Sequence, residues 1–320
     1  MQKTLFMCPG QGSQKLGMGK DFASRYAVAK NVFDEVDDVL GFRLSTKVMW
    51  GDDADILNDT SNAQVAIMAT SIAIARSLEY LTGKSISKIS NAVTGHSLGE
   101  YSALCIAGAI SLSDCTKVLR RRGTEMMKAA LKNNGTMAAV IGFNNNGLMR
   151  SVEELIKKAS GNDVLVIAND NSSKQIVISG TKEAIGRAKE LSGSFEIKRF
   201  IELTVSGAFH SPLMQHAQDS MVESIDSMQI NTPAVSLFST ISKQAESDPD
   251  VIKSLLIKQI THSVHWREVV LNCFNDNFTR MIEIGFGNVL CGLVPQTVQG
   301  VNVNSCGSVE KIEEVAKLLG

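Results

Sequence analysis

The segment Gly95-His96-Ser97-Leu98-Gly99 restricts more than any other what this chain can form. It fits the pattern G-x-S-x-G, and the surrounding residues predict a strand over 89–94 and a helix over 100–107. A strand, a sharp turn and a helix together lift a serine hydroxyl above a sheet. Glycines suit such a turn because a Cβ would collide with neighbouring chain. We therefore predict that Ser97 is a nucleophile, with a plain strand–helix connector as the alternative.

A nucleophilic serine also needs groups that stabilise the negative charge formed on its substrate. The helix after Ser97 would direct its first N–H groups, including that of Leu98, at an oxyanion. The loop 9–14 follows a predicted strand over 4–8 and contains Gln11 between two glycines. It lacks the G-K-[ST] of a Walker loop and the third glycine of a dinucleotide fingerprint. Its position suits the second half of an oxyanion hole, although a lone glycine-rich loop is more often a tight turn.

Ser97 needs a base, since a serine hydroxyl is scarcely ionised at neutral pH. His96 is its neighbour in a tight turn, where side chains point apart. His262 and His265 have a spacing that could suit a metal, but no accompanying ligand supports one, and we predict no metal site. His210 precedes Ser211-Pro212 in a predicted loop and is the best candidate by elimination. No acidic residue between Ser97 and His210 stands out as a third member.

The order of predicted elements favours an α/β protein. Strands alternate with helices up to about residue 131, as in a parallel sheet covered on both faces. Residues 133–205 instead show the order β-α-β-β-α-β, which is typical of a ferredoxin-like unit. We expect a large domain formed by residues 1–132 and 206–320, with a small subdomain of residues 133–205 inserted in it.

Composition excludes several classes of function. The net charge of the 320 residues is −1, and basic residues are dispersed, which gives no support for nucleic-acid binding. The six cysteines form no C-x-x-C pair, so neither a zinc site nor a disulfide framework is predicted. We find no signal peptide and no apolar run near the roughly 18 residues of a membrane helix. We therefore expect a cytoplasmic location and no membrane association.

These motifs together resemble the malonyl-CoA:acyl-carrier-protein transacylase family. The segments that carry the resemblance occur in family order along nearly the whole chain: Pro9-Gly-Gln-Gly-Ser-Gln14, Gly95-His-Ser-Leu-Gly-Glu-Tyr-Ser-Ala103, Arg122-Gly123, Ala168-Asn-Asp-Asn171, Gln175-Ile-Val-Ile-Ser-Gly180, Phe209-His-Ser211, Gln259 with Trp266, and Glu283-Ile-Gly-Phe-Gly287. Two segments depart from the usual pattern, namely Ser263-Val264, where proline is common, and Gln64-Val65-Ala66. Neither departure falls on a residue expected to carry chemistry.

The resemblance implies an α/β-hydrolase-like large domain and assigns roles to single residues. Ser97 would be acylated, His210 would be its base, and the carbonyl of Gln259 would orient the imidazole. The amides of Gln11 and Leu98 would form the oxyanion hole, and Arg122 would pair with the malonyl carboxylate. Two further residues, Gln64 and Asn169, are expected to line the cleft.

The resemblance also implies the reaction. A malonyl group would pass from malonyl-CoA through a malonyl-serine ester to the phosphopantetheine thiol of acyl carrier protein, by a ping-pong mechanism that supplies fatty-acid elongation. No bound cofactor and a monomeric state are expected. Two rival hypotheses are a serine hydrolase, which would share Ser97 and His210 but admit water, and a non-enzymatic protein that docks carrier proteins and needs neither residue.

Overall fold

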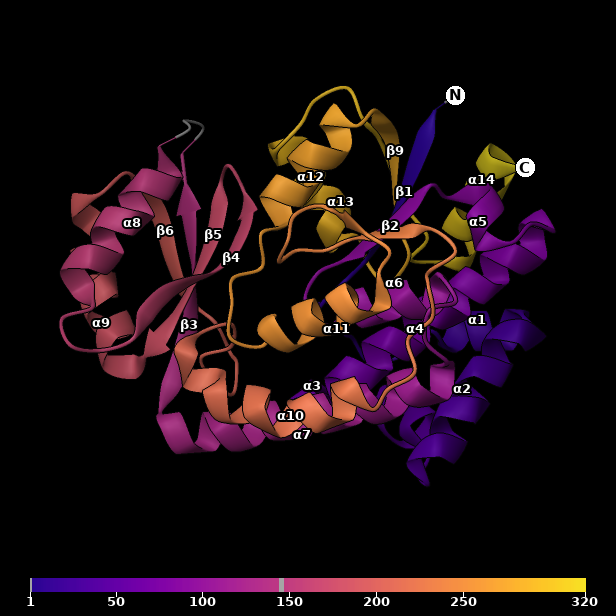
Figure 1. Ribbon diagram of the computed structural model, residues 1–320, viewed down its shortest axis with the longest axis horizontal. Helices are drawn as coiled ribbons and strands as arrows, with labels where there is room; N and C mark the ends of the chain where they lie inside the picture. Colours follow the sequence, from indigo (N-terminus) through magenta and orange to yellow (C-terminus); the bar gives the residue numbers. More distant parts are fainter. Residues whose placement is uncertain (1, 144–146) are drawn as a thin grey trace.

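The computed structural model describes residues 2–143 and 147–320, which form an α/β protein with two separate sheets (Figure 1). The larger sheet has the strand order β10-β9-β1-β2-β7-β8. Its strands are β1 (Lys3–Cys8), β2 (Ala92–Gly95), β7 (Ser236–Phe238), β8 (Ala245–Glu246), β9 (Phe278–Glu283) and β10 (Asn302–Ser305). The pairing of β8 with β7 is antiparallel, and the other pairings are parallel.

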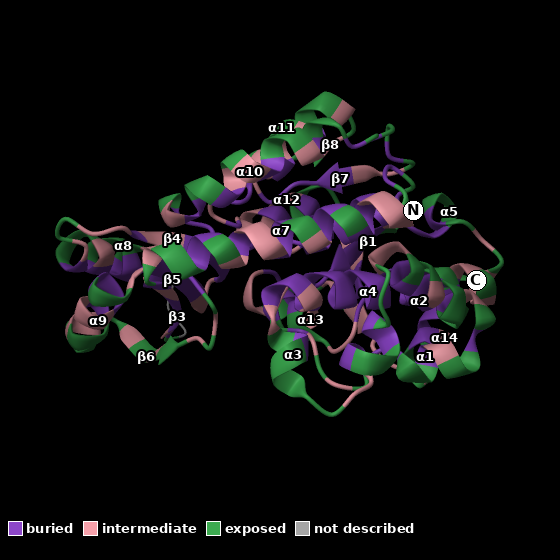
Figure 2. Cartoon of the chain, turned by 90° about the horizontal axis from the view of Figure 1, so that it is seen from below, coloured by how far each residue is buried: buried purple, intermediate pink, exposed green. Residues whose placement is uncertain are grey.

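Both faces of the larger sheet are covered, as its apolar strands predict. In β1, Phe6 and Cys8 belong to the main core, whereas Leu5 and Met7 belong to a second core on the opposite face. This alternation follows from the two-residue period of a strand. Figure 2 shows the buried residues of β1 and α4 in the interior of this part of the molecule. The sheet is thus a rigid central layer from which loops emerge at the carboxyl ends of the strands.

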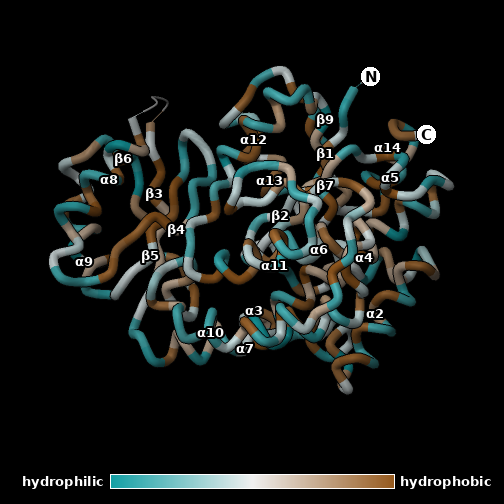
Figure 3. The backbone as a smooth tube through the Cα atoms, viewed as in Figure 1, coloured by the Kyte–Doolittle hydropathy of each residue, from teal (hydrophilic) through white to brown (hydrophobic). Residues whose placement is uncertain are grey.

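The smaller sheet is antiparallel and has the order β4-β5-β3-β6. It consists of β3 (Gly135–Gly142), β4 (Leu165–Ser172), β5 (Gln175–Thr181) and β6 (Ile197–Glu202), with α8 (Leu148–Ala159) and α9 (Lys182–Leu191) packed on one face. Figure 3 shows the hydrophobic segments that run along β3 and its neighbours. The predicted alternation of strands and helices in residues 133–205 is therefore present, although residues 144–146 lie outside the described part.

The remaining helices surround the larger sheet. They are α1 (Lys20–Arg25), α2 (Ala27–Leu40), α3 (Ala54–Asn58), α4 (Thr60–Thr82), α5 (Ile86–Ile89), α6 (Gly99–Ile106), α7 (Leu112–Asn133), α10 (Gln215–Asp226), α11 (Pro249–Lys258), α12 (Trp266–Asn275), α13 (Val289–Leu293) and α14 (Val309–Leu319). Four short helical turns complete the regular structure: Ser45–Met49, Ser192–Ser194, Pro212–Met214 and Val294–Gln296. An isolated parallel bridge between Asn169 and Val264 links β4 to the segment before α12.

Helix α4 corrects one expectation from the sequence. It is 23 residues long with a mean hydropathy of 1.2, so by length and composition it could cross a membrane. However, 72% of the apolar window is buried inside the protein, where α4 packs against α2 and α7. Its apolar character therefore reflects a core helix, which the search for an unbroken apolar run did not detect.

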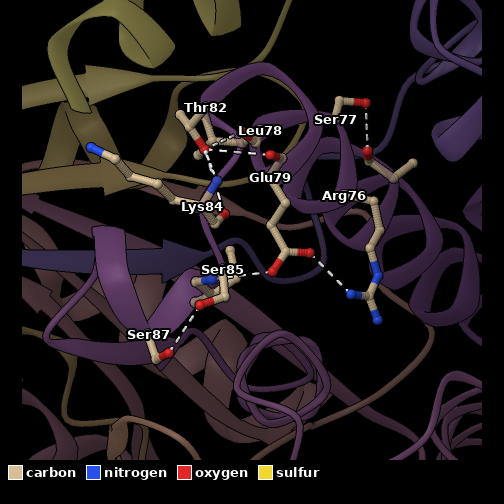
Figure 4. A network of polar contacts seen from close by, with 10 residues as sticks. Arg76, Ser77, Leu78, Glu79, Thr82, Lys84, Ser85 and Ser87 are labelled. Atoms are coloured by element: carbon tan, nitrogen blue, oxygen red, sulfur yellow. Dashed lines mark hydrogen bonds and ion pairs between the residues drawn. The ribbon is translucent and has the colours of Figure 1, made fainter. Parts of the chain in front are cut away.

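The carboxyl end of α4 is tied to the next helix by side-chain contacts (Figure 4). Glu79 accepts a hydrogen bond from Arg76 at 3.0 Å and another from the backbone N–H of Ile86 at 3.1 Å. Thr82 donates to the carbonyl of Leu78 at 2.8 Å. These contacts satisfy backbone groups left open at helix ends. The predicted start of the following strand was wrong. Residues 86–89 form the helix α5, so the strand predicted over 89–94 begins only at Ala92.

A second boundary matters for the site. Helix α7 runs from Leu112 to Asn133 and carries Arg122 at its middle. Arg122 faces inward because Gly123 lets α7 approach α4 closely: a Cβ there would lie 2.5 Å from the Cα of Ser61. The small residue therefore sets the distance between the two longest helices.

Replacing Gly123 by alanine should force α4 and α7 apart. We expect Gly123→Ala to lower the free energy of unfolding by about 1–3 kcal/mol, as over-packing does. Gly186→Ala in α9 is the matched control, because nothing lies within 4 Å of its added Cβ. It should raise stability by about 0.5–1 kcal/mol. Urea denaturation of both variants measures this, and equal stabilities would contradict the close contact.

Candidate active site

Ser97 lies at a sharp turn between β2 and α6, as the sequence predicts. Its φ angle is 53°, in the left-handed region where a non-glycine residue is strained. The flanking glycines are required by space: a Cβ on Gly95 would lie 1.9 Å from the carbonyl carbon of Gly99, and one on Gly99 would lie 2.2 Å from the carbonyl oxygen of Cys8. The turn thus holds the Ser97 side chain above the carboxyl end of the sheet.

His210 reaches Ser97 from a loop 113 residues further along the chain. Its Nε2 lies 2.9 Å from Ser97 Oγ, and its Nδ1 lies 2.8 Å from the carbonyl oxygen of Gln259. A carbonyl can only accept, so Nδ1 carries the proton and Nε2 is free to accept the serine proton. His210 also has a positive φ of 56°. Two strained residues therefore face one another, which is typical of functional sites.

The surroundings of His210 favour its neutral form. The side chain is buried, and burial, followed by the positive charge of Arg122, lowers the pKa of His210 to about 3. The hydrogen bond to the Gln259 carbonyl acts in the opposite direction but is smaller. A neutral imidazole is the state that can take a proton from Ser97.

The backbone amides predicted to form an oxyanion hole are those of Gln11 and Leu98. Both residues line the same cleft as Ser97. Within residues 2–143 and 147–320, neither amide donates a hydrogen bond to a protein acceptor. The loop of Gln11 lies against the turn, since a Cβ on Gly10 would lie 2.5 Å from the carbonyl oxygen of His96. Two backbone donors without a protein acceptor therefore belong to residues that line the cleft beside the serine.

Arg122 enters the site from the middle of α7 and is 1% exposed. One terminal nitrogen, Nη2, donates to Ser97 Oγ and to Gln259 Oε1, both at 3.1 Å, and Nη1 donates to Gln64 Oε1 at 2.7 Å. All three acceptors are uncharged. A buried guanidinium with neutral partners is suited to bind a carboxylate, because two parallel hydrogen bonds and opposite charge both favour that ligand.

The cleft beside Ser97 has a volume of about 480 Å³ and lies between the two sheets. Apolar side chains from the smaller sheet and the residue after β6 form one wall, among them Met137, Val177 and Leu203. Asn169 lines this cleft, as expected. Gln64 does not line it; it lies behind Arg122, buried, and its Nε2 contacts Met126 Sδ at 3.5 Å. Its place in the structure is thus as a support for the guanidinium.

Two partnerships in or near the site escaped the sequence analysis. His96 was rejected as a base, and its Nε2 indeed contacts Asn171 Oδ1 at 2.9 Å instead of Ser97. Asn171 in turn donates to Gln175 Oε1 at 3.1 Å, so a polar chain links the turn to the β4–β5 hairpin. Asn171 and Gln175 both lie in motifs that carry the family resemblance. The contact with His96 was not foreseen because Asn171 is 75 residues away from it in the sequence.

Other histidines lie away from this chemistry. His265 pairs with Glu268 at 3.3 Å, a partner that the sequence analysis did not identify, and His216 contacts Lys132 at 3.1 Å. No group of three or more potential metal-binding His, Cys, Asp or Glu side chains occurs in the described ranges. All six cysteines are free thiols.

Comparison with known proteins identifies the class. The acyl transferase domain family matches residues 5–317, and the chain belongs to that family. Within the class, the chain belongs to the malonyl CoA-acyl carrier protein transacylases. It is 38% identical to the member from Bacillus subtilis over 98% of this chain and 96% of that protein, and 35% identical to the one from Haemophilus influenzae over 98% and 99%.

Solved structures agree with this placement. An acyl-carrier-protein S-malonyltransferase from Bartonella henselae is 41% identical, with a TM-score of 0.94 over 100% of both chains. A malonyl-transacylase solved in complex with a type II PKS acyl-carrier protein is 30% identical, with a TM-score of 0.93 over 99% of this chain and 100% of that one. The fold and the family therefore agree along the full length.

The low pKa of His210 predicts an unusual pH profile. An imidazole with the ordinary pKa of about 6.5 would become protonated, and inactive as a base, below that pH. Because burial lowers the pKa of His210 to about 3, we expect the single-turnover rate of serine acylation to stay nearly constant from pH 8 to pH 5 at saturating malonyl-CoA. Rapid-quench measurement checks this; a tenfold fall per pH unit below 6.5 would contradict it.

Proposed function

We propose that this protein transfers a malonyl group from malonyl-CoA to the phosphopantetheine thiol of acyl carrier protein and so supplies fatty-acid chain elongation. The observation that carries the proposal is the hydrogen bond between Ser97 and His210 directly beside a buried Arg122. The relatives named as malonyl CoA-acyl carrier protein transacylases support the donor and the acceptor. No cofactor is required by this chemistry.

The first half-reaction acylates the enzyme. His210 Nε2 takes the proton of Ser97 as Oγ attacks the thioester carbonyl, while the amides of Gln11 and Leu98 stabilise the oxyanion. The imidazolium is stabilised by the Gln259 carbonyl, which holds Nδ1–H at 2.8 Å. The tetrahedral intermediate then collapses, the carbon–sulfur bond breaks, and His210 returns the proton to the departing thiolate. The product is a malonyl ester of Ser97.

The second half-reaction reverses these steps with a different thiol. His210 takes the proton of the phosphopantetheine thiol, and the thiol sulfur attacks the ester carbonyl. The bond between the carbonyl carbon and Ser97 Oγ then breaks, and His210 returns the proton to Ser97. One base thus serves both halves, as a ping-pong mechanism requires. The apolar wall formed by Met137, Val177 and Leu203 supports the proposal, because it limits water around the ester.

Arg122 would select the malonyl group. Its contacts with Ser97, Gln64 and Gln259 place the guanidinium beside the nucleophile, within reach of the free carboxylate of a serine-bound malonyl group. An acetyl group offers no such partner. Removing one member of a desolvated charge pair costs about 2–5 kcal/mol, which corresponds to roughly 30-fold to several-thousand-fold discrimination.

We also propose the finer fold assignment. The order β4-β5-β3-β6 and the helices α8 and α9 support a ferredoxin-like subdomain, with boundaries at 133 and 205. The parallel sheet with Ser97 after β2 supports an α/β-hydrolase-like large domain of residues 1–132 and 206–320. The cytoplasmic location and the monomeric state remain predictions.

Intact mass spectrometry tests the acyl-enzyme. Brief exposure to malonyl-CoA should add about 86 Da, one malonyl group, at Ser97. Ser97→Ala should remain unmodified and lose transfer while still binding carrier protein. Unimpaired transfer by Ser97→Ala would overturn the proposal. The fate of the ester separates a transferase from a hydrolase: a thiol acceptor should remove the adduct far faster than buffer does, and equal rates would favour a hydrolase.

Arg122→Ala tests selection. We expect this variant to raise the ratio of acetyl to malonyl transfer by about 30-fold or more, since only malonyl loses a charged partner. The ratio is the readout because Arg122 also contacts Ser97, so both absolute rates can fall. Arg121→Ala is the control, as this exposed neighbour contacts the Ser220 carbonyl instead. An unchanged ratio would remove Arg122 from this role.

A further inference from the structure

Glu100 is a buried carboxylate that the proposed mechanism does not use. It follows the serine turn in the first turn of α6 and is 0% exposed. Its Oε1 accepts hydrogen bonds from the backbone N–H of Thr240 at 2.6 Å and from the Thr240 hydroxyl at 2.5 Å. Its Oε2 has no hydrogen-bond partner among the described residues. An isolated buried charge is costly, so this carboxylate needs a compensating charge or a proton.

Arg122 is the compensating charge. It forms no ion pair within the described ranges, and its three hydrogen-bond acceptors are neutral. The charge of Glu100 nonetheless stabilises the guanidinium, and that of Arg122 favours the ionised carboxylate. Gln259 lies between them, because it accepts from Arg122 and its side chain also stabilises the Glu100 carboxylate. The empty site therefore holds one buried cation and one buried anion that do not touch.

We infer that Glu100 balances the charge of Arg122 in the empty site and takes up a proton when the substrate carboxylate binds Arg122. The inference rests on the proposed function, because it requires an acyl group that carries a carboxylate. Two anions would otherwise share one buried cation, and like charges in a low-dielectric site repel strongly. Glu100 acts through Arg122 without touching the substrate and is therefore a positioning residue.

The balance of charge and protons is simple. Before binding, Arg122 is positive and Glu100 is negative. Afterwards Arg122 is positive, the malonyl carboxylate is negative, and Glu100 is a neutral acid whose proton comes from solvent. Burial raises the pKa of Glu100 to about 7 in the empty site, despite the opposing effects of Thr240, Gln259 and Arg122. Protonation near neutral pH is thus accessible.

On the described elements packed against α6, we identify no other group suited to take this proton. Helix α6 packs against β1, β2, β7, α4 and α7. The titratable group that faces Glu100 from α7 is Arg122, and from its own helix Tyr101, whose pKa burial raises to about 12. Burial also raises the pKa of Cys8 on β1 and Cys115 on α7, so both stay neutral. The described residues of β2 and β7 carry no titratable side chain, and those of α4 lie at its far end, where Arg76 pairs with Glu79.

Proton uptake on acylation is the direct test. The enzyme is mixed with malonyl-CoA in weakly buffered solution containing a pH indicator, and the adduct is counted by mass spectrometry in the same sample. At pH 7.5 about three-quarters of Glu100 would be ionised before binding, so we expect roughly half to three-quarters of a proton taken up per malonyl-enzyme. Acetylation by acetyl-CoA should take up none. The released thiol loses a small fraction of its protons equally with both substrates.

Glu100→Gln should abolish the uptake while the adduct still forms, because the amide can replace the neutral acid. In the wild type, the KM for malonyl-CoA should rise up to about tenfold per pH unit above pH 7, since Glu100 must first be protonated. In the variant this KM should be nearly independent of pH between 6 and 8. Glu283→Gln is the matched control: Glu283 is also fully buried, but it contacts the backbone of Cys291 on the β9 side.

The outcomes are separable. Full acylation without proton uptake, or the same uptake in Glu100→Gln, would overturn this inference and leave the transferase intact. A failure to form the 86 Da adduct (about one malonyl group) would instead contradict the proposed function. A uniform loss of kcat at every pH in Glu100→Gln would indicate a structural role only. If that variant does not fold, the contrast between malonyl-CoA and acetyl-CoA in the wild type still decides.

Discussion

The contact between Ser97 and His210 depends on two backbone turns that are both held in the left-handed region. Ser97 has a φ of 53° and His210 a φ of 56°, and neither residue is glycine. Such conformations persist only where the surrounding structure over-determines them. At Ser97 the restraint is steric, since Gly95 and Gly99 pack against backbone too closely for a Cβ. At His210 the hydrogen bond from Nδ1 to the Gln259 carbonyl holds the side chain in place.

Burial then decides the charge of each group around this contact. It keeps His210 neutral, with a lone pair free to accept a proton, and it makes Arg122 dependent on ligands that can share its charge. It also raises the pKa of Glu100 to about 7, so that this acid is poised between its two forms. One cause, removal from water, thus produces a base, an anion receptor and a proton acceptor within one site. Each would behave as an ordinary surface residue if it were exposed.

The sequence analysis was most successful where chemistry is local. The turn at Ser97, the interior placement of the strand over 4–8 and the alternation of elements over 133–205 follow from residues close in the chain. Single-residue contacts across the chain were harder to foresee. Gln64 was expected to line the cleft but supports Arg122 from behind, because α4 and α7 pack at a distance set by Gly123. The strand before Ser97 was predicted to start at Ile89, yet Ile89 ends the short helix α5, whose first residue, Ile86, donates its backbone N–H to Glu79.

The segment that departs from the family pattern has a structural role of its own. Val264 pairs with β4: its N–H donates to the Ala168 carbonyl at 2.8 Å, and its carbonyl accepts from Asp170 at 3.0 Å. Ser263, where proline is common, donates to the Ile167 carbonyl, and Arg267 holds Asp170 through two contacts at 2.9 Å. This segment begins four residues after Gln259. The strand that presents Asn169 to the cleft is therefore anchored to the same stretch of chain that orients His210, so the binding wall and the base share one support.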